Sequence, residues 1–134
     1  MKKFELTSSM VTMGGVFYPR GYAVVMLPSA GQAEQVAREL EGSAKPPKEV
    51  MLLDPQTIIR DIAKVKDDSD LDLPSVGTEG ATVRKYVKLA REGHHGIMVP
   101  VDSSEEAEAL MEIARKAEFS YAQRYQLLAI QDLE

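Results

Sequence analysis

One short pattern occurs twice in this chain, at residues 25–36 and again at residues 99–110. In both copies an apolar run leads to a serine that can cap a helix, and apolar residues then recur at helical spacing. Four pairs of positions are identical in the two copies: Val25 and Val99, Ser29 and Ser103, Ala33 and Ala107, Glu34 and Glu108. The sequence therefore predicts two strand–turn–helix units of the same kind.

The same reading predicts the other elements. Strands are expected at residues 22–27, 50–53, 97–101 and 125–130, because these are short runs bounded by turn residues. The helix after Ser29 should end at Gly42, and the helix after Ser103 should run through Ala117. Two further helices are expected, one after Asp54-Pro55 and one over residues 81–92. Residues 1–15 are interpreted as a polar, flexible arm.

The predicted order is strand–helix–strand, two linking helices, and strand–helix–strand. Crossovers between parallel strands are right-handed, so each unit places its helix on the same side of its strands. Two such units sharing one sheet form an α+β, ferredoxin-like sandwich, whose other face is covered by the linking helices or by a partner. We expect a single domain over residues 1–134, with βαβ units at about 16–54 and 94–134 and a helical insertion at 55–93.

Composition excludes several kinds of site. The chain has no cysteine, so disulfides, thiolate catalysis and zinc–thiolate centres are ruled out. A formal net charge of −5 argues against binding to nucleic acid or anionic membranes, and no apolar run is long enough to span a bilayer. The N-terminus lacks the apolar region of a signal peptide, so we expect a cytoplasmic protein.

The first predicted strand resembles an RNA-recognition submotif. The motif begins with a basic residue, a glycine and an aromatic residue, which here are Arg20-Gly21-Tyr22. Two positions where aromatic side chains would stack on bases hold Val24 and Leu27 instead. We therefore interpret the segment as a glycine turn entering a buried strand, with RNA binding as an alternative.

An acidic segment lies between the two linking helices, at residues 66–80. Four carboxylates have the spacing of ligands in a calcium loop: Asp68, Asp70, Asp72 and Glu79. The glycine that such a loop needs at its sharp turn is replaced by Leu73. We interpret the segment as a solvated acidic loop, with calcium binding as the alternative, and assign no metal site.

The helix that follows could hold an anion at its start. Free N–H groups and the helix dipole favour negative charge there, and Arg84 could clamp it. His94 and His95 follow the end of this helix and should point to opposite faces of the next strand, which disfavours a shared metal. The alternatives are a well-capped helix start and histidines that cap the helix end. The candidate ligand-binding residues are Thr78, Arg84, Lys85, Tyr86, His94 and His95.

Aromatic and basic side chains gather just before the predicted last strand. Such residues are enriched at protein interfaces, and packing at a strand edge is the alternative. The candidate residues for a partner surface are Tyr22, Tyr121, Arg124 and Tyr125.

The second half of the chain resembles a known family. Residues 82–93 form a predicted helix that contains a tyrosine and ends at a glycine. They are followed by Gly96-Ile97-Met98-Val99-Pro100-Val101 and by a helix opening in Ser103-Ser104-Glu105-Glu106-Ala107-Glu108. This succession resembles the heat-induced general stress protein family of small ferredoxin-like domains. The resemblance implies the fold and a role in stress response, and it supplies no catalytic residues.

No segment carries a recognisable catalytic signature. We therefore expect a regulatory or interaction module without a catalytic set or cofactor, which self-associates as a homodimer through an exposed sheet face or edge. The alternatives are a sensor domain for a small anionic ligand or nucleotide, and an RNA-binding module.

Overall fold

The computed structural model describes residues 2–12, 15–63, 78–127 and 129–134 as a mixed α+β fold built on one six-stranded sheet. The strands are β1 (Lys2–Lys3), β2 (Tyr22–Leu27), β3 (Met51–Leu53), β4 (His95–Pro100), β5 (Tyr121–Tyr125) and β6 (Ile130–Asp132). Their order across the sheet is β1-β3-β4-β2-β5-β6. All neighbouring strands are antiparallel except β1 and β3.

Helices connect most of these strands. They are η1 (Ser8–Met10), α1 (Ala30–Glu41), α2 (Pro55–Thr57), the π-helix η2 (Ile58–Ile62), α4 (Thr78–Arg91) and α5 (Ser104–Lys116). The predicted start after Asp54 is confirmed, because the Asp54 carboxylate accepts a hydrogen bond from the Thr57 N–H at 2.7 Å. The acidic segment and its calcium alternative fall mostly on residues 64–77, outside the described residues, as do the side chains of Thr78 and Glu79.

The two strand–helix–strand units interleave within the sheet. Helix α1 joins β2 to β3, and these strands run parallel because each is antiparallel to β4, which lies between them. Helix α5 joins β4 to β5, with β2 between those two strands. Each unit therefore inserts one strand into the other, so neither has a separate sheet of its own.

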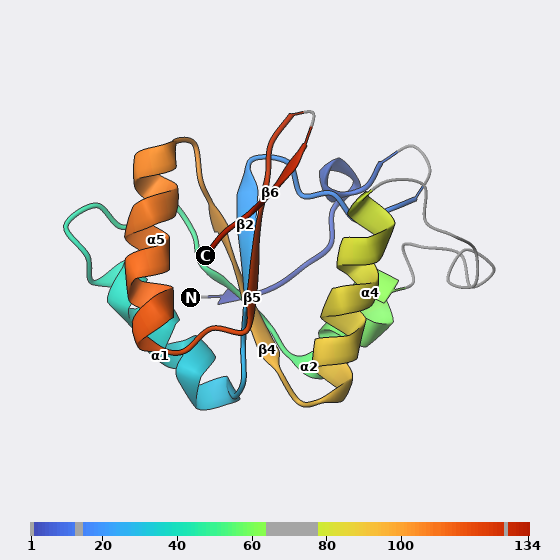
Figure 1. The fold of residues 1–134 in the computed structure, drawn as a ribbon, viewed down its shortest axis with the longest axis horizontal. Helices are drawn as coiled ribbons and strands as arrows, with labels where there is room; N and C mark the ends of the chain where they lie inside the picture. The colour runs from blue at the N-terminus through green and yellow to red at the C-terminus, as the bar shows by residue number, and fades with distance from the viewer. Residues whose placement is uncertain (1, 13–14, 64–77, 128) are drawn as a thin grey trace.

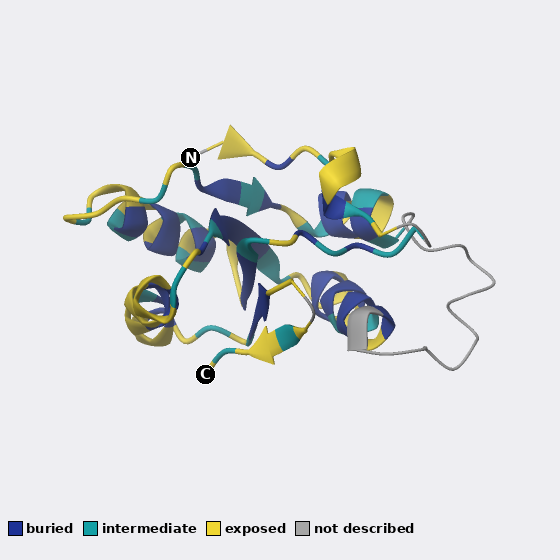
Figure 2. Cartoon of the chain, turned by 90° about the horizontal axis from the view of Figure 1, so that it is seen from above, coloured by how far each residue is buried: buried dark blue, intermediate teal, exposed yellow. Residues whose placement is uncertain are grey.

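Helices lie on both sides of the sheet (Figure 1). Alternation along β2 divides the core, because Val25 and Leu27 pack with α1 and α5 whereas Val24 and Met26 pack with α4 and η2. The inward sides of the helices are buried and their outer sides exposed (Figure 2). We expected either the linking helices or a partner to cover the second face of the sheet, and the linking helices cover it.

The repeated pattern forms the same local structure twice. The Ser29 hydroxyl accepts the Gln32 N–H at 3.2 Å, and the Ser103 hydroxyl accepts the Glu106 N–H at 3.1 Å. The Glu106 carboxylate in turn accepts the N–H of Asp102 at 2.6 Å. A capping box would use the N–H of Ser103, so the reciprocal bond has moved back by one residue.

The predicted last strand at residues 125–130 is wrong. The chain forms a hairpin there, with Tyr125 ending β5 and Ile130 beginning β6. Strand β5 was hard to recognise because two of its polar residues, Gln123 and Arg124, are buried on opposite faces of the sheet. Two of its buried positions therefore lack the apolar character that marks a buried strand.

The N-terminal segment is also more ordered than the sequence indicated. Strand β1 pairs with β3, and Phe4 and Met10 are buried in the core beside α4. Phe4 packs edge-on against Phe17, with ring centroids 6.2 Å apart. Apolar residues here are widely spaced, so their common burial arises only when the segment crosses the folded sheet.

Candidate functional site

A cleft of about 500 Å³ opens between the loop after α1 and the start of α5. We call it the α1–α5 cleft. Its apolar lining comes from Leu40, Pro46, Pro47, Val99, Pro100, Val101, Ala109, Leu110 and Ile113. Sites for small molecules typically have ~300–1,000 Å³ and predominantly apolar walls. The cleft therefore has the volume and lining of a small-molecule site.

Charged side chains of both signs line this cleft. Lys45 and Lys48 belong to the loop between α1 and β3. Asp102, Glu105 and Glu106 belong to the turn before α5 and its first turn. All five residues are exposed, so their charges lie where the apolar cavity opens to solvent. This arrangement can orient a ligand that carries both a negative and a positive group.

Local sequence explains why the backbone leaves this space. Helix α1 ends at Glu41 and is capped by Gly42, whose N–H donates to the carbonyl of Arg38. Pro46 and Pro47 cannot continue a helix, so the chain makes a loop before it enters β3. On the other side β4 ends at Pro100, and the Ser103 cap starts α5 after a short turn. Two strand–helix connections therefore meet at one end of the sheet.

Tyr86 and Tyr125, expected at a ligand site and a partner surface respectively, lie in the core. They are 0 % and 1 % exposed, and their hydroxyl oxygens are 2.8 Å apart. Burial, followed by the neighbouring Tyr125, raises the pKa of Tyr86 well above its ordinary value. Buried rings present no contact surface, so in this structure they hold α4 against β5.

Tyr121 lies beside this pair at the edge of the core. The centroid of its ring is 5.7 Å from that of Tyr86. The Lys85 ammonium lies 5.7 Å from the centroid of the Tyr121 ring. Burial raises the pKa of Tyr121, against a hydrogen bond with Thr82 that lowers it. Arg84 is half-buried in the same helix, α4. Lys85, Tyr86 and Tyr121 therefore gather on one side of the sheet, away from the α1–α5 cleft.

The two histidines have different partners. His94 Nδ1 is 2.8 Å from the Ser120 hydroxyl, and its Nε2 is 4.0 Å from a Glu92 carboxylate oxygen. His95 Nδ1 instead lies 3.2 Å from the carbonyl oxygen of Gly93. Within the described ranges, no group of three or more histidine and acidic side chains is placed to hold a metal ion.

His95 lines a separate cavity of about 390 Å³ at the opposite end of α1. Lys2, Lys3, Glu34 and Asp54 also line it. The pKa of Asp54 is lowered mainly by the hydrogen bond from the Thr57 N–H, with smaller effects of Lys3 and His95. Charges of both signs line this cavity, so it is a poor site for an anion.

The remaining candidates for a partner surface are split across the sheet. Tyr22 is half-buried on the α4 side, with its hydroxyl 3.2 Å from a Glu49 carboxylate oxygen. Burial first, and then Glu49, raises the pKa of Tyr22. Arg124 lies on the other side, against α5, and is 9 % exposed. These residues do not form one continuous surface with Tyr121 and Tyr125.

None of the predicted site residues whose side chains the structure describes lines the α1–α5 cleft. The sequence signal that could have indicated it is Lys45-Pro46-Pro47-Lys48, a rigid loop flanked by cations. Taken alone, the proline pair indicates only that a helix cannot continue through it. The loop that contains these prolines lies opposite Asp102 and Glu105 because strands distant in the sequence pair with one another.

No family model, curated protein or solved structure matches this chain. The resemblance to the stress protein family therefore stays a prediction. None of the helices in the described ranges is long and apolar enough to cross a membrane.

Proposed function

We propose that this protein is a regulatory module that binds a small molecule in the α1–α5 cleft, on a ferredoxin-like scaffold. The observation that carries the proposal is the cleft itself, an apolar cavity of about 500 Å³ with lysines on one side and carboxylates on the other. This develops the ligand-sensor alternative and moves its site away from the start of α4.

The strand order supports the ferredoxin-like assignment. The four strands of the two units lie in the order β5-β2-β4-β3, with α1 and α5 packed on the same side. Interleaved βαβ units of this kind are the split βαβ arrangement. In this proposal β1 and β6 extend the sheet at its two edges, and α4 covers the second face.

The charges around the cleft support a ligand of zwitterionic, amino-acid type. A carboxylate would lie towards Lys45 and Lys48, an ammonium group towards Asp102 and Glu105, and an aliphatic or aromatic body on the apolar lining. Charge complementarity of this kind orients a ligand and discriminates against molecules that lack either group.

Self-association stays a prediction. Helices occupy both faces of the sheet in the described structure, so neither face is exposed for contact with a second copy. The edges are β1, of two residues, and β6, of three. Short edge strands are poor templates for pairing between sheets. The proposed cleft is formed by one chain and needs no second copy.

Calorimetric titration with three related probes tests the proposal. We expect L-leucine to bind more tightly than 4-methylpentanoate, which lacks the ammonium group, and more tightly than 3-methylbutylamine, which lacks the carboxylate. Ala109→Phe should abolish binding because Ala109 is an exposed residue that lines the cleft. Ala81→Phe, an exposed position in α4 on the other side of the sheet, is the matched control and should bind normally.

Two paired substitutions distinguish the two sides of the cleft. The double variant Lys45→Gln, Lys48→Gln should remove the advantage of leucine over the amine. Asp102→Asn with Glu105→Gln should remove its advantage over the carboxylate. The proposal fails if none of the aliphatic or aromatic L-amino acids binds, or if Ala109→Phe binds them as the unchanged protein does.

A further inference from the structure

We propose a second binding site, for a small aliphatic monocarboxylate, in the cavity between α5 and the C-terminal segment, with Arg124 as the residue that binds the carboxylate. The cavity has about 290 Å³, and Arg124 lines it together with residues of α5, β6 and the last two residues of the chain. It lies apart from the α1–α5 cleft, with which it shares no lining residue.

The state of Arg124 carries this inference. Alternation in β5 directs its side chain to the α5 side of the sheet, where it is more than nine-tenths buried. Within the part of the chain that the structure describes, no hydrogen bond or ion pair joins its guanidinium to another residue. The guanidinium nitrogens are not among the fully buried side-chain atoms that lack a partner, so they open onto the cavity. An entering carboxylate would supply two parallel hydrogen bonds to the guanidinium fork.

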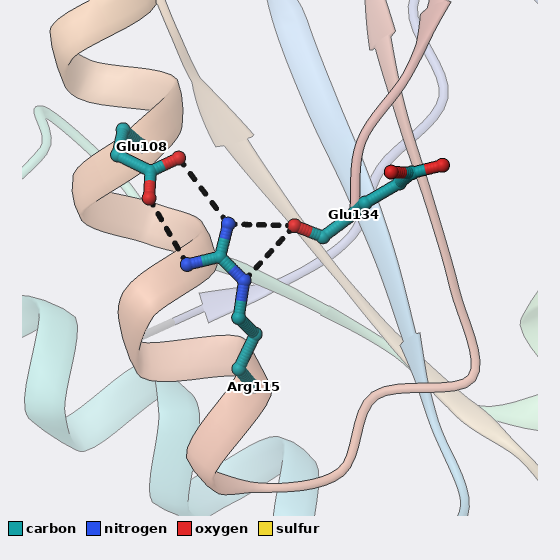
Figure 3. Close-up of polar contacts among 3 residues, drawn as sticks. All are labelled: Glu108, Arg115 and Glu134. Carbon is teal, nitrogen blue, oxygen red and sulfur yellow. Dashed lines mark hydrogen bonds and ion pairs between the residues drawn. The ribbon is translucent and has the colours of Figure 1, made fainter.

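Two of the carboxylates that line this cavity, Glu108 and Asp132, already have other partners. Glu108 binds Arg115 through both oxygens, at 3.0 and 3.2 Å (Figure 3). Asp132 accepts a hydrogen bond from the amide of Gln123. Arg115 also binds the main-chain oxygen of Glu134 at 2.6 and 2.9 Å, and so holds the C-terminal segment beside α5 (Figure 3).

Charge and lining define the ligand class. Among the described residues, the cavity is lined by one cation, Arg124, and by three acids, Glu108, Asp132 and Glu134. A multiply charged anion such as phosphate would be repelled, whereas one negative charge can pair with Arg124. Ala107, Met111 and Leu133 supply apolar wall for a short aliphatic chain. A monocarboxylate of a few carbons meets both conditions.

Titration with butyrate, followed by two-dimensional NMR at constant ionic strength, tests the site. Butyrate should shift the signals of the Arg124 side chain and of the α5 amides near Ala107 and Met111. Butyramide, which has the same shape and no charge, and inorganic phosphate should bind at least roughly tenfold more weakly, since a hydrogen bond to a charged group contributes about 1.5–3 kcal/mol.

Substitutions at Arg124 complete the test. Arg124→Met should bind butyrate at least tenfold more weakly, while its unfolding temperature stays about level because Arg124 makes no hydrogen bond or ion pair with another described residue. Arg124→Lys should weaken binding while keeping the charge, because the fork is lost. Arg91→Met, at an exposed position of α4, controls for the charge change and should bind normally.

The proposal is overturned if butyramide binds as well as butyrate, or if Arg124→Met and Arg124→Lys both retain full affinity. Signals that move only around the α1–α5 cleft would overturn it too. Ala109→Phe should leave butyrate binding unchanged, so failure of the proposed function and failure of this site are separate results.

Discussion

The hydroxyl oxygens of Tyr86 in α4 and Tyr125 in β5 lie 2.8 Å apart inside the core. The ring of Phe17 packs edge-on against both, with centroid distances of 6.3 and 6.0 Å. A polar contact enclosed by aromatic rings is favourable only while both partners are present, because water cannot replace either of them. This contact therefore fixes how α4 lies on the sheet.

Removing either hydroxyl should destabilise the protein. Tyr86→Phe and Tyr125→Phe each take a partner from a hydroxyl that is buried in the core, and each should cost about 1–3 kcal/mol of unfolding free energy. Urea unfolding measures both. The double variant should cost less than the sum of the two; strict additivity would contradict the coupling.

Alkaline pH should destabilise the protein through the same residue. Burial raises the pKa of Tyr86 well above its ordinary value of 10.0, so the folded chain keeps a proton that the unfolded chain loses. The stability is fully present below the unfolded pKa and is lost as pH rises from there towards the folded pKa. Tyr22 and Tyr121 have raised pKa values too and add to this loss.

Urea unfolding at about pH 8 and about pH 11 measures the effect, and ultraviolet absorbance of tyrosinate follows ionisation directly. Tyr86→Phe should show a smaller loss between the two pH values than the unchanged protein. An equal loss in both proteins would show that Tyr86 is not the source.

Two glycine substitutions should change stability in opposite directions. Gly93 has φ = +92°, and an added Cβ there meets no atom within 4 Å, so Gly93→Ala is unfavourable through backbone strain alone, by about 1–2 kcal/mol. Gly31 lies in α1, where an added Cβ comes no closer than 3.9 Å to the Ser29 hydroxyl. Gly31→Ala should stabilise by about 0.5–1 kcal/mol. Thermal unfolding measures the change in stability of both variants. A change in the same direction in both would contradict this account.

Arg115→Gln should release the C-terminal segment without unfolding the protein. Arg115 joins Glu108 to the main-chain oxygen of Glu134, while the N–H of Leu133 donates to the carbonyl of Ala122 at 3.0 Å. Hydrogen exchange should therefore become faster at Leu133 and stay unchanged in β2. Lys116→Gln, the neighbouring cation paired with Glu39, is the control. Equal exchange rates at Leu133 in all three proteins would exclude this role for Arg115.

Sequence patterns predicted best the features that depend on neighbouring residues. Ser29, Asp54 and Ser103 form the expected caps, because a cap needs only a side-chain oxygen and an N–H three residues further along. Strand β2, the first of the predicted strands, has its predicted bounds because it is a continuous apolar run. Strand β5 was missed because Gln123 and Arg124 are buried polar residues, whose burial depends on partners elsewhere in the chain.

The candidate sites follow the same division. Local patterns suggested that His94 and His95 do not act together, and their ring nitrogens do have different partners, the Ser120 hydroxyl and the Gly93 carbonyl. Patterns could not indicate that Lys48 and Glu105 line the same cleft, or that Arg124 lies buried against α5. Periodicity and capping act over a few residues and decide the helices and strands. Cavities and buried charges arise where segments distant in the chain are brought together, so only tertiary packing decides them.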